Sequence, residues 1–249
     1  MNITQQIWAK SDTVLFIFAG AAAEFSLNKA VDWLYFTGKL PADPLGRLFS
    51  TVQYAQKILF LDEQSSQKAI KEIAHIHKGV ERARGTAIPD WAYKDVLYML
   101  IYYSIASYEL LERPLTVNEK EEVLQVFLKV GLGMGLKELP EDYASWEIDR
   151  AIHLGQDLEH GDFTADLYAQ YKKHLGGLRF TLLKEVQKLL APPQIKKSLG
   201  LGRWSFLGIA VPLYKQLRSF KMSSWLKNSM MPQQYQTQIQ NLNIISNEK

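Results

Sequence analysis

Apolar residues recur at helical spacing along most of the chain, and no stretch sustains the strict alternation of a half-buried strand. Helix start and stop signals frame the apolar segments. Asp43 is placed to cap a helix that has Pro44 at its first position, and Thr116 with Glu119 forms the pattern of a capping box. The predicted helices cover residues 43–60, 65–85, 89–114, 116–136, 140–160 and 163–191, the last broken near Gly176-Gly177. We therefore expect an all-α fold with a single multi-helix domain.

Two apolar stretches differ from the amphipathic helices. Residues 89–114 lie between two prolines and are apolar nearly all round, so they predict a central buried helix. The run at 13–25 is too short to span a bilayer, and the positively charged start of a signal peptide does not precede it. We expect neither a signal peptide nor a transmembrane helix, and a cytoplasmic protein that is at most peripheral at a membrane.

The clearest boundary in the chain is the Pro192-Pro193 pair. It predicts an all-α domain over 1–191, a basic and aromatic segment over 192–228, and a flexible tail over 229–249 that is rich in Gln and Asn. Charge follows this division, because residues 186–247 carry eight basic and no acidic residues while the rest of the chain is acidic. Such a surface favours an anionic partner.

The basic segment at 203–227 has the aromatic and cationic composition of a membrane interface, so a peripheral membrane contact is one interpretation. The other is a helix packed on the domain with a solvated basic face, since Pro212 is expected to break a long amphipathic helix. No nucleic-acid-binding motif accompanies the charge, and we expect no nucleic acid partner.

Cysteine is absent, which excludes disulfides, thiolate catalysis and iron–sulfur clusters. Histidine chemistry remains. His75 and His77 are two apart and point to nearly opposite sides of a helix that turns about 100° per residue. His77 falls in the apolar stripe with Ile70 and Ile73, whereas His75 falls on the polar side. On spacing alone, His77 is either a packed histidine satisfied by a hydrogen bond or an axial ligand of haem iron.

A di-iron carboxylate site is a second metal hypothesis. It requires two carboxylate-x-x-His motifs and two further carboxylates from separate helices. The residues that could supply them are Glu72 with His75, Asp157 with His160, Glu24 and Glu109. A charged, solvated helix surface explains the same two motifs.

Two further features concern helix faces. The Gly-rich run at 131–135 lacks the spacing and the preceding strand of a dinucleotide fingerprint, and close helix packing is the better explanation. Arg47 and Thr51 lie four apart on one face of the 43–60 helix. They are either an ordinary surface stripe or polar groups that line a pocket, with Arg47 available to pair a carboxylate.

With these segments laid out, the chain resembles the oxygenase MpaB family, which includes rubber oxygenase (latex-clearing protein). The resemblance runs from about residue 16 to about residue 155. It is carried by DPLGRLFSTVQYAQKILF, by the IHKGV that contains His77, and by ERPLTVNEKEEVLQVFLKVGLGMGLKELPEDY.

The resemblance implies an all-α, haem b-binding fold in which His77 is the proximal iron ligand, and in which Arg47 and Thr51 line the haem pocket. It implies oxidation of a hydrophobic, isoprenoid-like substrate by O₂, with cleavage of a C=C bond. The chain resembles a divergent member. Ser50 stands where rubber oxygenase has a lysine, and Tyr98 lies at or near the histidine of a Trp-Val-His triplet that many members carry. A non-catalytic helical protein that binds lipid or isoprenoid at a membrane surface is therefore an alternative.

Overall fold

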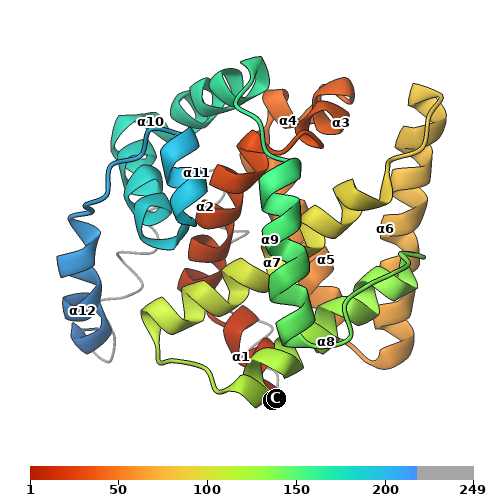
Figure 1. The fold of residues 1–249 in the computed structure, drawn as a ribbon, viewed down its shortest axis with the longest axis horizontal. Coiled ribbons are helices and arrows are strands. Elements are labelled where there is room, and N and C mark those ends of the chain that lie inside the picture. Colours follow the sequence, from red (N-terminus) through yellow and green to blue (C-terminus); the bar gives the residue numbers. More distant parts are fainter. Residues whose placement is uncertain (218–249) are drawn as a thin grey trace.

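The computed structural model describes residues 1–217 and confirms an all-α fold (Figure 1). The part of the chain beyond residue 217, including the predicted tail at 229–249, lies outside the described residues. The helices are α1 (Ile3–Trp8), α2 (Ser11–Leu27), α3 (Val31–Phe36), α4 (Lys39–Ala42), α5 (Pro44–Phe60), α6 (Glu63–Arg84), α7 (Asp90–Leu111), α8 (Val117–Gly133), α9 (Tyr143–Gln156), α10 (Asp162–Leu190), α11 (Pro193–Ser198) and α12 (Leu207–Leu217).

Local capping explains where the predicted helices begin and end. The Asp43 side chain accepts a hydrogen bond from the Gly46 amide at the start of α5, and Thr116 forms the predicted capping box with Glu119. Helix α6 begins two residues before the predicted start, because Asp62 rather than a serine caps it. Gly176 has φ 74° and ψ 169° and breaks α10, as predicted from the glycine pair.

The centre of the fold is α2, which packs against α7 on one side and α10 on the other. Its predicted apolar run is buried, and Gly20 makes the crossing with α7 possible: a Cβ atom there would lie 2.3 Å from the Tyr103 ring. The glycines of α8 serve the same purpose, as expected from their pattern. A Cβ on Gly131 would meet Leu97 and one on Gly133 would meet Ile70, both at 2.9 Å.

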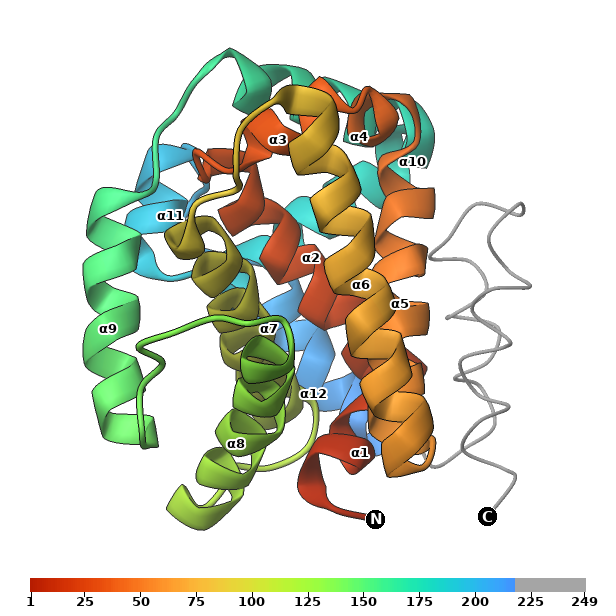
Figure 2. The ribbon, with the colours of Figure 1, turned by 90° about the vertical axis from the view of Figure 1, so that its right-hand side faces the viewer.

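Helix α7 is the second buried element, and other helices lie on both of its sides. Figure 2 shows α9 on one side of α7 and the antiparallel pair α5 and α6 on the other. The C-terminal end of α2 meets the residues that follow α9 through two backbone hydrogen bonds. Lys29 N donates to Asp157 O, and Glu159 N donates to Leu27 O. Within residues 1–217 this contact contains the isolated β-bridge between Asn28 and Leu158, and no strand is formed there.

Residues beyond the Pro-Pro pair stay in contact with the domain. Ile195 of α11 is fully buried against Ala23 and Leu27, and α12 packs on α7 and α10. The expectation that Pro212 breaks the helix is wrong for the described residues, because α12 continues through it. Pro212 and Gly208 are both exposed, so water can hydrate the carbonyl that loses its donor. In the described residues, no helix is long and apolar enough to cross a membrane.

Candidate functional site

The predicted site residues lie on the antiparallel pair α5 and α6. The two helices are connected by a short turn after Phe60, so the first turns of α5 lie opposite the last turns of α6. Arg47 is in the first turn of α5 and His77 is two turns from the end of α6. This arrangement brings Arg47 close enough to His77 for its charge to act on the imidazole.

The His77 ring is half-buried and has an unusual hydrogen-bonding state. Its Nδ1 atom is shielded from solvent and has no hydrogen-bond partner among residues 1–217. The ring packs edge-to-face on Tyr93 of α7, with 5.2 Å between ring centroids. The prediction that His77 faces inward is thus confirmed, whereas a hydrogen bond that would satisfy a purely structural histidine is not formed at Nδ1.

Electrostatics keeps the His77 imidazole neutral. Burial and the nearby Arg47 charge lower its pKa to about 4, and Glu81 opposes them only weakly. The Glu81 carboxylate is engaged elsewhere: one of its oxygens accepts hydrogen bonds from the Ile88 amide at 2.9 Å and from the Tyr93 hydroxyl at 3.3 Å. Neutral imidazole with a free ring nitrogen is the form that binds a metal ion.

Arg47 is a half-buried cation. Burial lowers the pKa of its guanidinium, and Tyr54 partly offsets that effect. Among residues 1–217, no carboxylate forms an ion pair with it. A partly desolvated cation without a counter-charge favours an anionic group at this position.

The hydroxyl groups on α5 are committed to their own helix. Ser50 and Thr51 both donate to the carbonyl oxygen of Arg47, at 2.7 and 3.2 Å. Thr51 lies one turn after Arg47 on the same face and is half-buried. With its proton used in this way, the Thr51 oxygen can only accept a hydrogen bond from a bound group.

The residues proposed for a di-iron site are not brought together. His75 and His160 are exposed. Glu24 is buried and forms a two-pronged ion pair with Arg150, at 2.7 and 3.0 Å, while Glu109 pairs with Lys120 at 3.1 Å. Since two of the proposed carboxylates are held by cations and both histidines face solvent, the structure contradicts the di-iron arrangement.

Tyr98 points away from His77. It is buried on the α9 side of α7, where its hydroxyl donates to the Asp149 carboxylate at 2.5 Å. Its ring packs on Trp146 and His153 of α9. Tyr98 therefore belongs to the contact between α7 and α9.

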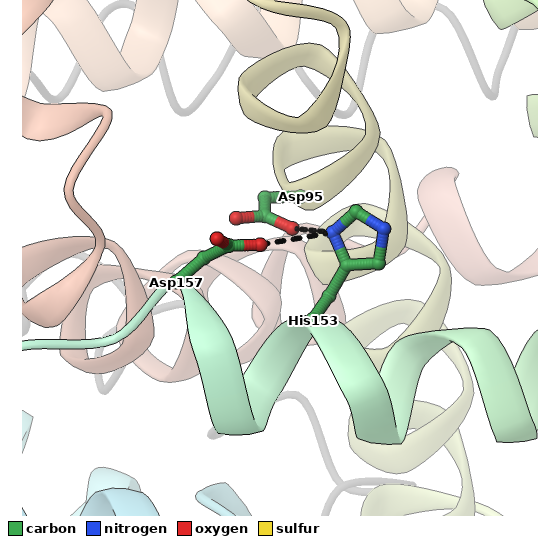
Figure 3. Close-up of side chains that lie close together, drawn as sticks. All are labelled: Asp95, His153 and Asp157. Carbon is green, nitrogen blue, oxygen red and sulfur yellow. Dashed lines mark hydrogen bonds and ion pairs between the residues drawn. The ribbon is translucent and has the colours of Figure 1, made fainter.

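That contact contains a cluster that the sequence patterns did not reveal. Asp95 of α7, His153 of α9 and Asp157, which follows α9, turn their side chains toward one another (Figure 3). The hydrogen bond to Asp95 raises the pKa of His153. A local signal was present, because His153 has an aspartate four residues before it and another four residues after it.

Comparison with known proteins places this architecture in a family. The family model described as ER-bound oxygenase mpaB/B′/rubber oxygenase, catalytic domain, matches residues 8–220. No curated protein matches this chain. No solved structure matches it either. Because the family model covers most of the 249 residues, the chain belongs to the family of the mpaB-type and rubber oxygenase catalytic domains.

Proposed function

We propose that this protein is a haem b-dependent oxygenase that acts with O₂ on a hydrophobic substrate, with cleavage of an isoprenoid C=C bond as its reaction. Membership of an oxygenase catalytic-domain family supports the reaction class. The cofactor and the site rest on the residues of α5 and α6.

The observation that carries the proposal is the Nδ1 atom of His77. No group of residues 1–217 hydrogen-bonds this shielded ring nitrogen, and an unsatisfied buried polar atom costs free energy unless a ligand satisfies it. The imidazole is neutral at neutral pH, because its pKa is about 4. A neutral imidazole is the form that would ligate haem iron, because the ligating nitrogen must be unprotonated.

The other residues would hold and shield the cofactor. Haem b carries two carboxylate groups. Arg47 could pair with one of them, because it forms no ion pair with a carboxylate of residues 1–217. The Thr51 oxygen is free to accept a hydrogen bond, and the Tyr93 ring closes one side of His77. When bound, haem supplies the redox chemistry that allows O₂ to react with an alkene, and the protein contributes orientation and a water-poor site.

A hydrophobic substrate also needs a place where it is collected, and we assign that role to the surface formed by residues 203–215. Trp204, Ile209 and Leu213 are exposed there. The cations Arg203 and Lys215 flank them, and no acidic residue occurs between 186 and 247. Exposed aromatic and aliphatic side chains with basic neighbours suit the headgroup region of an anionic membrane.

A second candidate function is binding of lipid or isoprenoid without catalysis. One observation favours it: an open surface hollow of about 360 Å³ lies between α7 and α12. Leu110, Gly208, Val211 and Pro212 line it, with Lys215 beside them. An apolar hollow with one cation suits an acyl or isoprenoid chain that carries an anionic head.

Haem titration followed by absorption spectroscopy separates the two functions. We expect the purified protein to give a sharp Soret band after addition of one equivalent of haem, and the band to shift on reduction. His77→Ala should abolish the band, whereas His75→Ala should retain it, because His75 is exposed on the opposite side of α6.

The result that would overturn the oxygenase proposal is equally defined. Absence of a Soret band with wild-type protein, or an unchanged band with His77→Ala, would refute the proposal that His77 ligates haem. Binding of a fluorescent isoprenoid without haem binding would then establish the non-catalytic function.

A further inference from the structure

The contact between α7 and α9 holds three potential metal ligands. Asp95 Oδ1 lies 2.6 Å from His153 Nδ1, and Asp157 Oδ2 lies 3.2 Å from the same nitrogen. The three ligand atoms all lie within 4.8 Å of one another (Figure 3). Ligands of a tetrahedral zinc ion are about 3.4 Å apart, so adjustments of a few tenths of an ångström to an ångström would seat an ion among them.

The remaining atoms of these side chains are held by outer partners. The second oxygen of Asp95 accepts a hydrogen bond of 2.6 Å from Asn28, whose own amide oxygen is fixed by the Ala30 amide. The other ring nitrogen of His153 faces Asp149 at 3.8 Å. The Tyr98 hydroxyl orients Asp149. A carboxylate behind the distal nitrogen of a ligating histidine is the usual outer shell of a metal site.

A single proton on His153 does not balance the negative charges of this cluster. One Nδ1–H group can donate well to one acceptor, yet two carboxylates approach the same nitrogen. Asp149 adds a third carboxylate on the other side of the ring. Lys29 is close enough for its charge to act on Asp157, but its ammonium donates a hydrogen bond to the Gln156 carbonyl. A divalent cation at Nδ1 would neutralise the two carboxylates that a single proton leaves in excess.

We propose that Asp95, His153 and Asp157 bind a divalent transition-metal ion, Zn²⁺ or Mn²⁺, that ties α9 to α7. One imidazole with two carboxylates suits these ions, since imidazole favours zinc and carboxylate is accepted by both. The chain supplies three ligands and leaves the fourth position to water. Mg²⁺, which prefers oxygen ligands and near-ideal octahedral geometry, should bind much more weakly.

This site is structural and separate from the proposed haem site. Tyr93 contacts His77, and Asp95, two residues later, points to the opposite side of α7. The Asp95 and His153 side chains are 4% and 14% exposed, and the crevice that they line has no room for a substrate. The ion would join α7 and α9 through two ligands, Asp95 and His153, that are 58 residues apart in the sequence.

Metal binding by the full chain, after treatment with a chelator, tests the proposal. We expect one equivalent of Zn²⁺ or Mn²⁺ in equilibrium dialysis and a higher melting temperature in circular dichroism. Asp157→Asn should weaken binding about tenfold or more, because it removes a ligand and keeps the shape. The matched controls are Glu159→Gln, which removes a charge two residues away, and His160→Gln, which removes an exposed histidine.

Wild-type protein decides the outcome even if Asp157→Asn fails to fold. Less than one equivalent bound, or an unchanged melting temperature, would refute the site. So would equal binding by Mg²⁺, loss of binding in His160→Gln, or unaltered binding in a folded Asp157→Asn. None of these results depends on haem binding. The proposed metal site can therefore be refuted without refuting the proposed haem site, and the reverse is also true.

Discussion

Residue environment, and not residue type, separates the two neighbouring histidines of α6. His75 is exposed among polar neighbours, while His77 turns toward α5 and α7 and loses most of its hydration. Burial and the Arg47 cation both disfavour a positively charged imidazole at position 77. The same two effects make the stability of the protein sensitive to acid.

The pH dependence of stability follows from the pKa of His77. Its value is about 4 in the folded protein, against 6.5 for an ordinary histidine. Between these values the unfolded chain binds a proton that the folded chain does not. The stability linked to His77 is therefore fully present above pH 6.5 and is lost as the pH falls toward 4.

Urea unfolding of the haem-free protein at pH 7 and pH 4.5 measures this effect. We expect wild type to lose about 1–2 kcal/mol more than His77→Gln over this range, after allowance for solvent screening of the half-exposed ring. Arg47→Gln should reduce the loss, because it removes a charge that lowers the pKa of His77. Equal losses in wild type and His77→Gln would show that the imidazole titrates normally.

At the scale of elements, α2 and α7 approach each other closely where they cross. Tyr103 is fully buried and its ring occupies the space next to Gly20. A methyl group there would lie 2.3 Å from an aromatic carbon that the surrounding core holds in place. Neither helix can move away freely, since α2 is also packed against α10.

Two glycine substitutions should thus have opposite effects. We expect Gly20→Ala to lower the free energy of unfolding by about 1–3 kcal/mol through overpacking. Gly79→Ala in α6, where a Cβ meets nothing within 4 Å, should raise it by about 0.5–1 kcal/mol through helix propensity. Urea unfolding monitored at 222 nm compares the two. Destabilisation by both variants to the same degree would contradict the packing explanation.

Helix positions could be predicted from the sequence where local groups determine them. Asp43 and Thr116 cap their helices through atoms only three residues away, so the sequence shows both ends of the interaction. The inward face of His77 also follows from spacing within one helix. In contrast, whether Arg47 has an ion-pair partner within residues 1–217 depends on which carboxylates other helices bring near it, and a stripe on one helix does not contain that information.

The cluster at α7 and α9 shows the same limit. Asp95 and His153 are 58 residues apart and meet only when α9 packs across α7. The spacing of Asp149, His153 and Asp157 placed three ionisable groups on one face of α9, but a solvated helix face has the same pattern. The other half of the signal is Asp95, a buried aspartate in the largely apolar α7. The division of the chain at residues 191 and 228 remains a prediction.

On the scale of the whole molecule, apolar exposure and positive charge coincide near α12. Leu207, Val211 and Tyr214 face the domain, and the Tyr214 hydroxyl donates to Asp12 at 2.8 Å. The outward side carries Ile209 at 72% exposure and Leu213 at 57%, with Trp204 before the helix at 69%. Lys196 and Lys197 in the last turn of α11 add to the positive charge of this part of the chain.

Vesicle flotation tests whether this face contacts a membrane. We expect wild-type protein to float with vesicles that contain phosphatidylserine, and to bind phosphatidylcholine vesicles far less. Ile209→Glu should weaken binding at least about tenfold, because insertion of one isoleucine is worth about 1.5–3 kcal/mol and the new charge is repelled. Ile148→Glu is the matched control, since Ile148 on α9 is similarly exposed, at 67% against 72% for Ile209.

Salt separates the two contributions to that binding. Attraction of basic residues to anionic lipid is screened at high ionic strength, whereas insertion of apolar side chains is not. Wild-type protein should therefore retain part of its binding in 0.5 M salt, and Ile209→Glu should retain none. If Ile148→Glu and Ile209→Glu weaken flotation equally, exposed apolar surface in general is responsible and α12 has no special role. If wild type fails to float with anionic vesicles, the proposed role of this surface in collecting a hydrophobic substrate is refuted.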